Sequence, residues 1–267
     1  MIILVKKKKI INKDFKKYFK YNRPPAHEPN YFIKDYKREI LKCNICGHFI
    51  ARHKINTSNF YKRNYSTISH GNELYKKFKR ILKLKKQSDN YHRVKRVLLF
   101  FKDLKKKKIK LLDIGSGLGI FLYSLKRKVN WTLFGIEPDM NFAKFSKFDL
   151  ELNIENKNLN LFKKKNFDII TLNKVLEHVK NPINLLCGAK NTLGKGGYIY
   201  IEVPDGTSAS NTVNGKEREE FFLDHLHIFS IKSLSDLIIA SGMSIEKIES
   251  IKEKSGKLSI YAFIRKN

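Results

Sequence analysis

A glycine-rich run is the stretch of this 267-residue chain whose residue types point most directly to chemistry. Residues 111–119 read L-L-D-I-G-S-G-L-G, so Asp113 stands between an apolar run and a G-x-G-x-G spacing. A glycine-rich turn behind a parallel strand lets a ligand approach the backbone, and it aims a helix N-terminus at that ligand. A nicotinamide fingerprint would read G-x-G-x-x-G. The spacing and the acid at Asp113 instead favour a cofactor that carries positive charge over one that presents a pyrophosphate.

A second acidic residue, Glu137, follows the next predicted strand within the run F-G-I-E-P-D at residues 134–139. A carboxylate at that point can accept hydrogen bonds from both hydroxyls of an adenosine ribose. NAD-binding proteins share this feature. Glu137 therefore indicates an adenosine-containing cofactor but does not choose among such cofactors by itself.

A series of motifs gives the sequence a resemblance to a known family. In chain order they are D-x-G-x-G-x-G from Asp113, G-I-E-P-D, F-D-I-I at 167–170, V-L-E-H-V at 175–179, Y-I-Y-I-E-V-P at 198–204 and H-L-H-I-F-S at 225–230. Over residues 88–265 the sequence resembles the class I S-adenosylmethionine (SAM)-dependent methyltransferases, and among them the small-molecule and sugar methyltransferase branch. Each motif alone is a weak signal, but their order and spacing together are specific.

The resemblance implies how a cofactor is held. The methionine end of SAM would lie against Asp113 and the glycine turn, and Glu137, followed by Pro138, would bind the ribose. Leu172 and Asn173 would flank the sulfonium, and Asn156 or Asn158 would lie near the adenine. The turn itself consists of Gly115, Ser116, Gly117 and Gly119.

Two histidines, His225 and His227, are the candidates for acting on the methyl acceptor. The resemblance places substrate-facing residues after the fifth strand, where the sequence reads D-H-L-H at residues 224–227. Methyl transfer is an in-line displacement that needs an aligned nucleophile and, for some acceptors, a base of near-neutral pKa. Because they are two residues apart in an extended segment, the two rings are predicted to point the same way. We expect one of them to be a base or a substrate ligand; the alternative is packing between loop and sheet.

The motif V-L-E-H-V also contains two side chains that could do chemistry, Glu177 and His178. For these we favour helix packing and capping. Other family signatures are absent. The segment L-N-K-V at 172–175 lacks the D/N-P-P-Y/F motif of amino-group methyltransferases, no Pro-Cys nucleophile is present, and Cys187 reads as a small core residue. These absences argue against several classes of nucleic-acid methyltransferase.

Cys43 and Cys46 form a C-x-x-C pair of the kind that holds one side of a zinc ion. The stretch resembles the second half of the zinc ribbon that precedes some sugar methyltransferases. A complete site needs two more ligands, and the nearby donors before His70 are His27, His48 and His53. The sequence leaves two alternatives, a zinc site and a relic turn with two free thiols.

The chain is strongly basic, with 55 Lys and Arg against 25 Asp and Glu and a formal net charge of +30. Such a charge suits a polyanionic partner such as RNA, a nucleotide-linked substrate or an anionic membrane surface. However, the lysines are scattered over many segments, including residues 6–9, 16–17, 105–108 and 163–165, with little interleaving of arginine and aromatic residues. We therefore favour a compositional origin for the charge.

Apolar periodicity predicts the elements that must position these residues. Helices are expected over residues 72–104, 118–128, 139–149 and 230–240 and from Asn181, with strands over 109–114, 131–136, 167–172, 198–203, 244–251 and 257–265. This alternation predicts an α/β fold, a Rossmann-like, doubly wound, mostly parallel sheet of seven strands. Residues 1–70 are expected to form a basic N-terminal segment, an arm or a frayed helix over 1–22, with the incomplete zinc knuckle. Residues 71–267 are expected to form the methyltransferase domain.

No apolar run approaches the roughly 18 to 20 residues needed to span a bilayer, and the apolar start at residues 1–5 is too short for a secretory signal. We therefore expect a cytoplasmic protein. The sequence as a whole predicts a SAM-dependent methyltransferase of a small-molecule or sugar acceptor, with O-methylation slightly favoured. The alternatives are an RNA methyltransferase, favoured by charge alone, and a non-catalytic SAM-binding or regulatory protein. The sequence does not indicate an oligomeric state.

Overall fold

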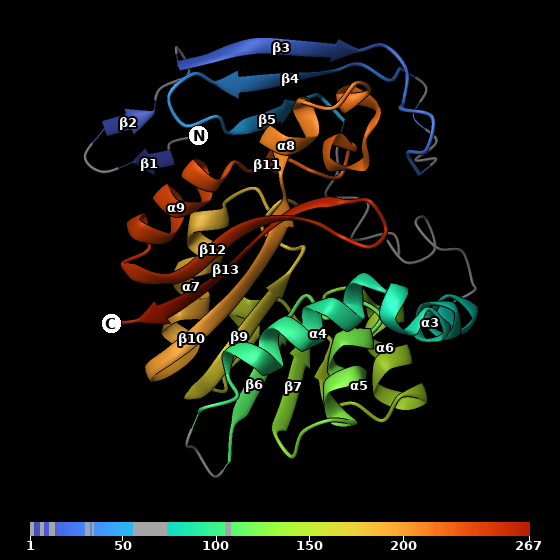
Figure 1. The fold of residues 1–267 in the computed structure, drawn as a ribbon, viewed down its shortest axis with the longest axis vertical. Coiled ribbons are helices and arrows are strands. Elements are labelled where there is room, and N and C mark those ends of the chain that lie inside the picture. The colour runs from blue at the N-terminus through green and yellow to red at the C-terminus, as the bar shows by residue number, and fades with distance from the viewer. Residues whose placement is uncertain are drawn as a thin grey trace.

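A seven-stranded sheet forms the centre of the protein (Figure 1). The computed structural model describes residues 3–5, 8–10, 14–29, 33, 35–55, 74–104 and 108–267. The strand order is β12-β13-β10-β9-β6-β7-β8, and only β13 runs antiparallel to its neighbours. The strands are β6 (Lys110–Ile114), β7 (Thr132–Ile136), β8 (Ile154–Glu155), β9 (Phe167–Asn173), β10 (Leu193–Pro204), β12 (Met243–Lys252) and β13 (Leu258–Lys266). The predicted fold class is confirmed.

Helices cover both faces of this sheet, because its central strands are apolar on both sides. On one face, α7 (Pro182–Thr192) and α9 (Ile231–Ala240) pack on a core that includes Ile170 and Ile201. On the other face, the core around Leu111 and Tyr200 lies beneath four helices. These are α3 (Leu74–Lys83), α4 (Asp89–Phe100), α5 (Ile120–Lys126) and α6 (Met140–Lys144), the last continued by a π-helix over Phe145–Asp149.

Local capping signals fix where several helices begin. The helix expected from Asn181 is α7, which Asn181 caps through its side chain, with Pro182 at the first helical position. Ser230 and Ser233 form a capping box at the start of α9. Asp139 accepts hydrogen bonds from the first backbone amides of α6. The chain therefore encodes these boundaries within three or four residues of each helix start.

Two predicted boundaries are wrong. The helix expected over residues 72–104 is divided by a 3-10 turn at Lys85–Gln87, where Lys85 has a φ of +46°; residues 72 and 73 lie outside the described part. The strand expected over residues 198–203 begins earlier, at Leu193, so Gly196 and Gly197 lie inside β10. There the pairing with β9 shifts between Leu193 and Tyr198, so the two glycines form an irregularity within one long strand.

A second, antiparallel sheet lies across one end of the large one (Figure 1). Its order is β11-β5-β4-β3, with β3 (Phe15–Tyr21), β4 (Arg38–Cys43), β5 (Phe49–Arg52) and β11 (His227–Ile228). The N-terminal segment thus takes its fourth strand from a distant part of the chain. A two-stranded hairpin of β1 (Ile3–Val5) and β2 (Lys8–Ile10) precedes it. Residues 15–21 are therefore a strand and not part of an arm or frayed helix. The expected boundary between the N-terminal segment and the methyltransferase domain, at residues 70 and 71, lies outside the described residues. The same is true of Lys105 to Lys107.

The small sheet lies at the edge where the parallel strands end. The short helix α8 (Gly206–Ser210) follows β10 directly, and a Cβ atom added at Gly206 would lie 2.8 Å from both Phe49 and Ile228. Phe49, Phe221 and Ile228 share a separate apolar core at this junction. The backbone at the start of α8 therefore approaches the small sheet so closely that only glycine fits at position 206.

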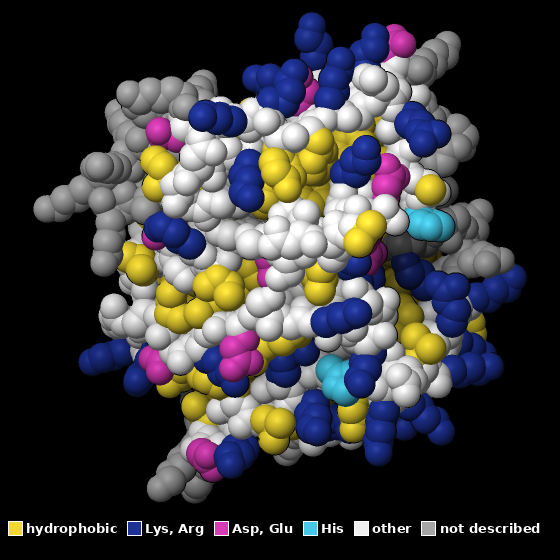
Figure 2. All heavy atoms as spheres, turned by 45° about the horizontal axis from the view of Figure 1, so that its top comes forward, with side chains coloured by type: hydrophobic (Ala, Val, Ile, Leu, Met, Phe, Trp, Pro, Cys, Tyr) yellow, Lys and Arg dark blue, Asp and Glu magenta, His cyan; other side chains and the backbone are white. Residues whose placement is uncertain are grey.

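The surface is basic without a single concentrated stripe on the face shown in Figure 2, where lysine and arginine side chains are spread between apolar and neutral areas. In the part of the chain that the structure describes, every helix is too short or too polar to span a bilayer.

Candidate active site

The glycine turn after β6 has the backbone conformation that its sequence predicts. Gly115, Gly117 and Gly119 have φ values of +70°, +52° and +68°, in the left-handed region that favours glycine. A Cβ atom at Gly115 would lie 2.9 Å from the side chain of Val175, whereas one at Gly117 would meet nothing within 4 Å. Gly117 therefore presents bare backbone to open space, as a ligand-binding turn requires.

Glu137, at the end of β7, is hydrogen-bonded to this turn. Its Oε2 accepts from the Gly117 amide at 2.7 Å, and its Oε1 accepts from the Asp139 amide at 2.8 Å. Burial raises the pKa of Glu137 to about 7. A carboxylate has about four acceptor positions, so roughly two remain for a ligand. Pro138 continues the same turn, and the Asn156 side chain donates to the carbonyl oxygens of Glu137 and Pro138, at 2.8 and 3.0 Å.

Asp113 lies beside the end of the neighbouring strand β9. Its Oδ1 accepts from Thr171 Oγ1 at 2.6 Å and from Asn173 Nδ2 at 2.8 Å. Burial raises the pKa of Asp113 to about 7. The predicted neighbour Leu172 is fully buried in the apolar core, so only its backbone can flank a ligand. Asn158 precedes the 3-10 helix Leu159–Leu161.

Two buried polar atoms at this edge have no hydrogen-bond partner, the Ser116 hydroxyl and Asn173 Oδ1. Buried polar groups are normally paired, so an orphaned pair beside open backbone suggests an absent ligand. Together with the carboxylates of Asp113 and Glu137, these atoms offer acceptors for cationic and hydroxyl groups. The residues present thus fit the ribose and amino-acid ends of SAM.

The two candidate histidines point to different surroundings, contrary to the prediction. His227 is almost fully buried, and its Nδ1 lies 3.0 Å from Nε2 of His48. His225 lies in a turn before β11, with its ring 4.9 Å from that of His178. Burial lowers the pKa of each candidate to about 4. Their segment is extended only from residue 227 onward, so the alternation assumed for a strand does not apply.

Glu177 and His178 are not part of a helix. They lie in a turn over residues 176–178 that follows β9. Glu177, His178 and His225 each place a potential ligand atom within 4.8 Å of the other two. The sequence contains a signal for this cluster. Glu177 and His178 follow the carboxyl end of a strand expected to be parallel, and such ends meet at the ligand-binding edge of the sheet.

The cysteine pair does not have the surroundings of a zinc site. Cys43 and Cys46 are buried and free, and burial raises the pKa of the Cys46 thiol to about 12. Among the described residues, they belong to no group of three or more metal donors. Both ring nitrogens of His48 already contact Ser233 and His227. The turn instead packs on Phe15 as a small apolar cluster.

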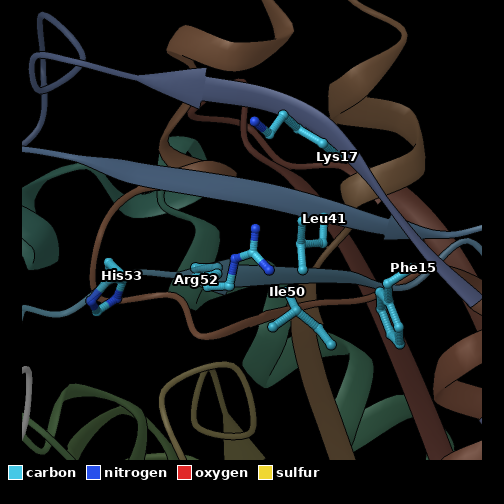
Figure 3. A pocket seen from close by; sticks show the side chains of 7 residues that line it. Phe15, Lys17, Leu41, Ile50, Arg52 and His53 are labelled. Atoms are coloured by element: carbon cyan, nitrogen blue, oxygen red, sulfur yellow. The ribbon is translucent and has the colours of Figure 1, made fainter. Parts of the chain in front are cut away.

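A hollow of about 500 Å³ lies elsewhere, on the small sheet (Figure 3). Side chains of β3, β4 and β5, together with His53, line it. None of the predicted cofactor residues contributes to it. Its labelled lining residues are Phe15, Lys17, Leu41, Ile50, Arg52 and His53.

Comparisons with known proteins agree with this geometry. A family model described as a methyltransferase domain matches residues 86–248. An uncharacterized protein of Methanocaldococcus jannaschii is 26% identical over 159 residues, which are 54% of this chain and 75% of that protein.

Two solved structures have the same fold. The plantazolicin methyltransferase BamL, in complex with a triazolic desmethylPZN analog and SAH, is 16% identical with a TM-score of 0.57, over 79% of this chain and 97% of that one. A SAM-dependent methyltransferase and possible histamine N-methyltransferase from Thermotoga maritima is 18% identical with a TM-score of 0.54, over 78% of this chain and 100% of the other.

Proposed function

Because the chain belongs to the methyltransferase domain family, we propose that it transfers a methyl group from SAM to a hydroxyl of a small-molecule acceptor, with a sugar as the favoured class. One observation carries the cofactor assignment. The open, left-handed backbone at Gly117 donates to the Glu137 carboxylate, so a glycine turn and a ribose-binding acid meet in one place. Asp113 lies one strand away, as a cofactor with a cationic amino-acid end requires.

The residues at this edge would contact different parts of the cofactor. Glu137 would accept the ribose hydroxyls, and Asp113, Ser116 and Asn173 would hold the amino-acid end. When bound, SAM supplies a methyl group on positively charged sulfur, and transfer leaves the electron pair of the broken carbon–sulfur bond on that sulfur. The protein's own contribution is then to align the acceptor and exclude water.

The acceptor is proposed to lie between the turn after β9 and the segment that contains His225. Val175 packs on Gly115, so the chain between Val175 and His178 begins at the glycine turn and ends beside His225. His227 faces His48 and is not available to a substrate on this side. His225 is therefore the remaining candidate, of the two predicted histidines, for contact with the acceptor.

Calorimetric titration of the purified protein with SAM tests the cofactor site. We expect micromolar binding by the wild type, lost or much weakened in Gly117→Arg and Glu137→Ala. Glu155→Ala is the matched control, because Glu155 ends the neighbouring strand β8 but pairs with the surface residues Lys157 and Lys164. A folded wild type that binds no SAM would refute the proposal.

A screen of acceptors by mass spectrometry tests the substrate class. Nucleotide sugars and simple sugars are compared with amines and with RNA, and we expect methylated product from the sugar set. Methylated RNA, with an affinity that falls steeply as salt rises, would overturn the sugar assignment. SAM binding without transfer to any acceptor would favour a regulatory protein.

A further inference from the structure

We propose that Glu177, His178 and His225 bind a divalent transition-metal cation, and that the acceptor oxygen coordinates to it. The three side chains come from two separate places, the turn after β9 and the segment before β11. Their potential ligand atoms all lie within 4.8 Å of one another, the one group of this kind among the described residues. Metal–ligand distances near 2.0–2.2 Å would require only a small closing movement.

The carboxylate of Glu177 is buried without a hydrogen bond to another residue. The residue is 0% exposed, and both of its carboxylate oxygens are unpaired in this way. A buried, unpaired carboxylate is strongly unfavourable unless a cation compensates it. Besides His178, the charge of Lys174 also acts on this carboxylate, but the Lys174 ammonium already donates to Ser259 and lies 3.9 Å from Glu202. A bound cation would satisfy Glu177 directly.

Both imidazoles are held in the orientation that metal ligands need. His178 Nδ1 lies 2.9 Å from the backbone carbonyl oxygen of Asp224, and His225 Nδ1 lies 2.9 Å from that of Glu220. A carbonyl oxygen only accepts, so in its neutral form each imidazole carries the proton on Nδ1 and keeps the lone pair on Nε2. His178 Nε2 faces Glu177, 4.0 Å from Oε1. Metal-binding histidines are commonly fixed through their second nitrogen in this way.

The backbone also locks the two segments together. The Glu177 carbonyl oxygen accepts from the amides of Leu226 and His227, at 2.8 and 3.1 Å. The turn that carries two of the ligands is therefore bonded to the residues that directly follow the third. The ligands are placed by main-chain hydrogen bonds, not by flexible loops, which favours a preformed site.

The donor set indicates the class of metal. Two imidazoles and one carboxylate suit Zn²⁺, Mn²⁺ or Fe²⁺, whereas Mg²⁺ and Ca²⁺ prefer oxygen ligands alone. Three protein ligands leave coordination positions open, as in catalytic sites. The cluster thus has the composition of a site that binds a substrate atom as well as a metal.

The position of the cluster links it to the acceptor, and this part rests on the proposed function. Val175 contacts Gly115, and Glu177 is two residues further on, at most about 7 Å along the chain. A hydroxyl coordinated to the metal loses its proton to solvent more readily. Its oxygen can then form the new bond to the methyl carbon, while the electron pair of the broken bond stays on the sulfur of SAM.

Metal binding can be tested without any activity measurement. The chelator-treated, dialysed protein is titrated with ZnCl₂ and with MnCl₂ by calorimetry, beside Glu177→Gln and His225→Ala. We expect a single equivalent to bind the wild type, with affinity at least about tenfold weaker in both variants. The controls are His92→Ala, a histidine on α4 outside the cluster, and Cys43→Ser/Cys46→Ser. Both controls should bind like the wild type.

A spectrum of the Co²⁺-loaded wild type provides a measurement that needs no variant. We expect visible bands without the intense near-ultraviolet absorption of cobalt bound to thiolate. No metal bound by the folded wild type, or binding lost only in the cysteine variant, would overturn the proposal.

SAM titrations of the metal-free protein separate the two proposals. SAM binding without metal binding would reject the metal site alone. Metal binding without SAM binding would reject the proposed function and leave the metal site in place.

Discussion

Nε2 of His48 lies 3.0 Å from Nδ1 of His227, and the two residues are 179 positions apart in the chain. His48 follows the cysteine turn, and His227 begins β11, which pairs with β5. The contact is therefore where the N-terminal segment joins the large domain. Both rings are buried, and Ser233 at the start of α9 contacts the other nitrogen of His48.

Removing either imidazole should lower stability, because the nitrogen of the remaining ring loses its hydrogen-bond partner. We expect His48→Ala and His227→Ala each to lower the free energy of unfolding by about 1–3 kcal/mol for the unpaired polar group, plus the cost of the cavity. Urea denaturation of both single variants and the double variant measures their coupling, expected near 1 kcal/mol. Strictly additive effects would mean that the contact contributes nothing.

The buried ion-pair network between helix α4 and strand β10 should contribute more to the free energy of unfolding than any surface ion pair. Arg93 and Arg96 both donate to the Glu202 carboxylate, which is fully buried. Burial alone would raise the pKa of Glu202, but Arg93 opposes this and holds the pKa well below its usual value. Glu202→Ala leaves the buried Arg93 guanidinium without its carboxylate, while Arg96 keeps Glu253, and we expect a loss of about 3–5 kcal/mol.

Asp236→Ala is the control for that variant, since Asp236 pairs with Lys232 on the surface of α9, where such pairs contribute about 0.3–0.5 kcal/mol. Thermal unfolding followed by circular dichroism measures both. Equal shifts for the two variants would contradict the expected role of the buried network.

Two glycines of similar backbone conformation should respond differently to alanine. Both Gly117→Ala and Gly119→Ala introduce left-handed strain of about 1–2 kcal/mol. At Gly119 the new Cβ atom would also lie 2.7 Å from Ser146 Oγ, and the overpacking adds about 1–3 kcal/mol. Chemical denaturation should show Gly119→Ala as the less stable protein. Gly117→Ala should mainly weaken SAM binding, because its Cβ atom enters the open space of the turn.

SAM affinity should rise with pH. Burial raises the pKa of both Asp113 and Glu137 to about 7, so below pH 7 these carboxyl groups are largely protonated in the ligand-free protein. A cationic ligand favours the ionised form, and each group then weakens binding by at most about tenfold per pH unit below its pKa. We expect the dissociation constant to fall from pH 5 to about 7 and to level off above.

Calorimetry in buffers of different ionisation enthalpy checks this through the protons released on binding. Asp113→Asn should bind more weakly with a shallower pH dependence, since Glu137 alone remains to titrate. In the ligand-free protein, the folded state binds the Asp113 proton more tightly than the unfolded state does, because the pKa of Asp113 is raised on folding. Asp113 therefore stabilises the fold at low pH, and this contribution is lost as the pH rises from about 4 to 7. A pH-independent SAM affinity would contradict the assignment of both carboxylates.

The sequence by itself determined the features that depend on a few neighbouring residues. The order of strands and helices, the glycine turn, and the cap at Asn181 follow from local backbone preferences and apolar periodicity. Asp113 and Glu137 could be placed because each ends a recognisable strand next to the turn. The family resemblance rests on the same local motifs, and the match over residues 86–248 agrees with it.

Only the tertiary structure decided which distant side chains meet. His225 and His227 are two residues apart, yet one contacts His178 and the other contacts His48. Their directions depend on a turn held by Glu177, about fifty residues earlier, and on pairing with β5 near the N-terminus. Long-range contacts of this kind are set by packing and main-chain hydrogen bonds between elements, for which a single sequence contains no local signal.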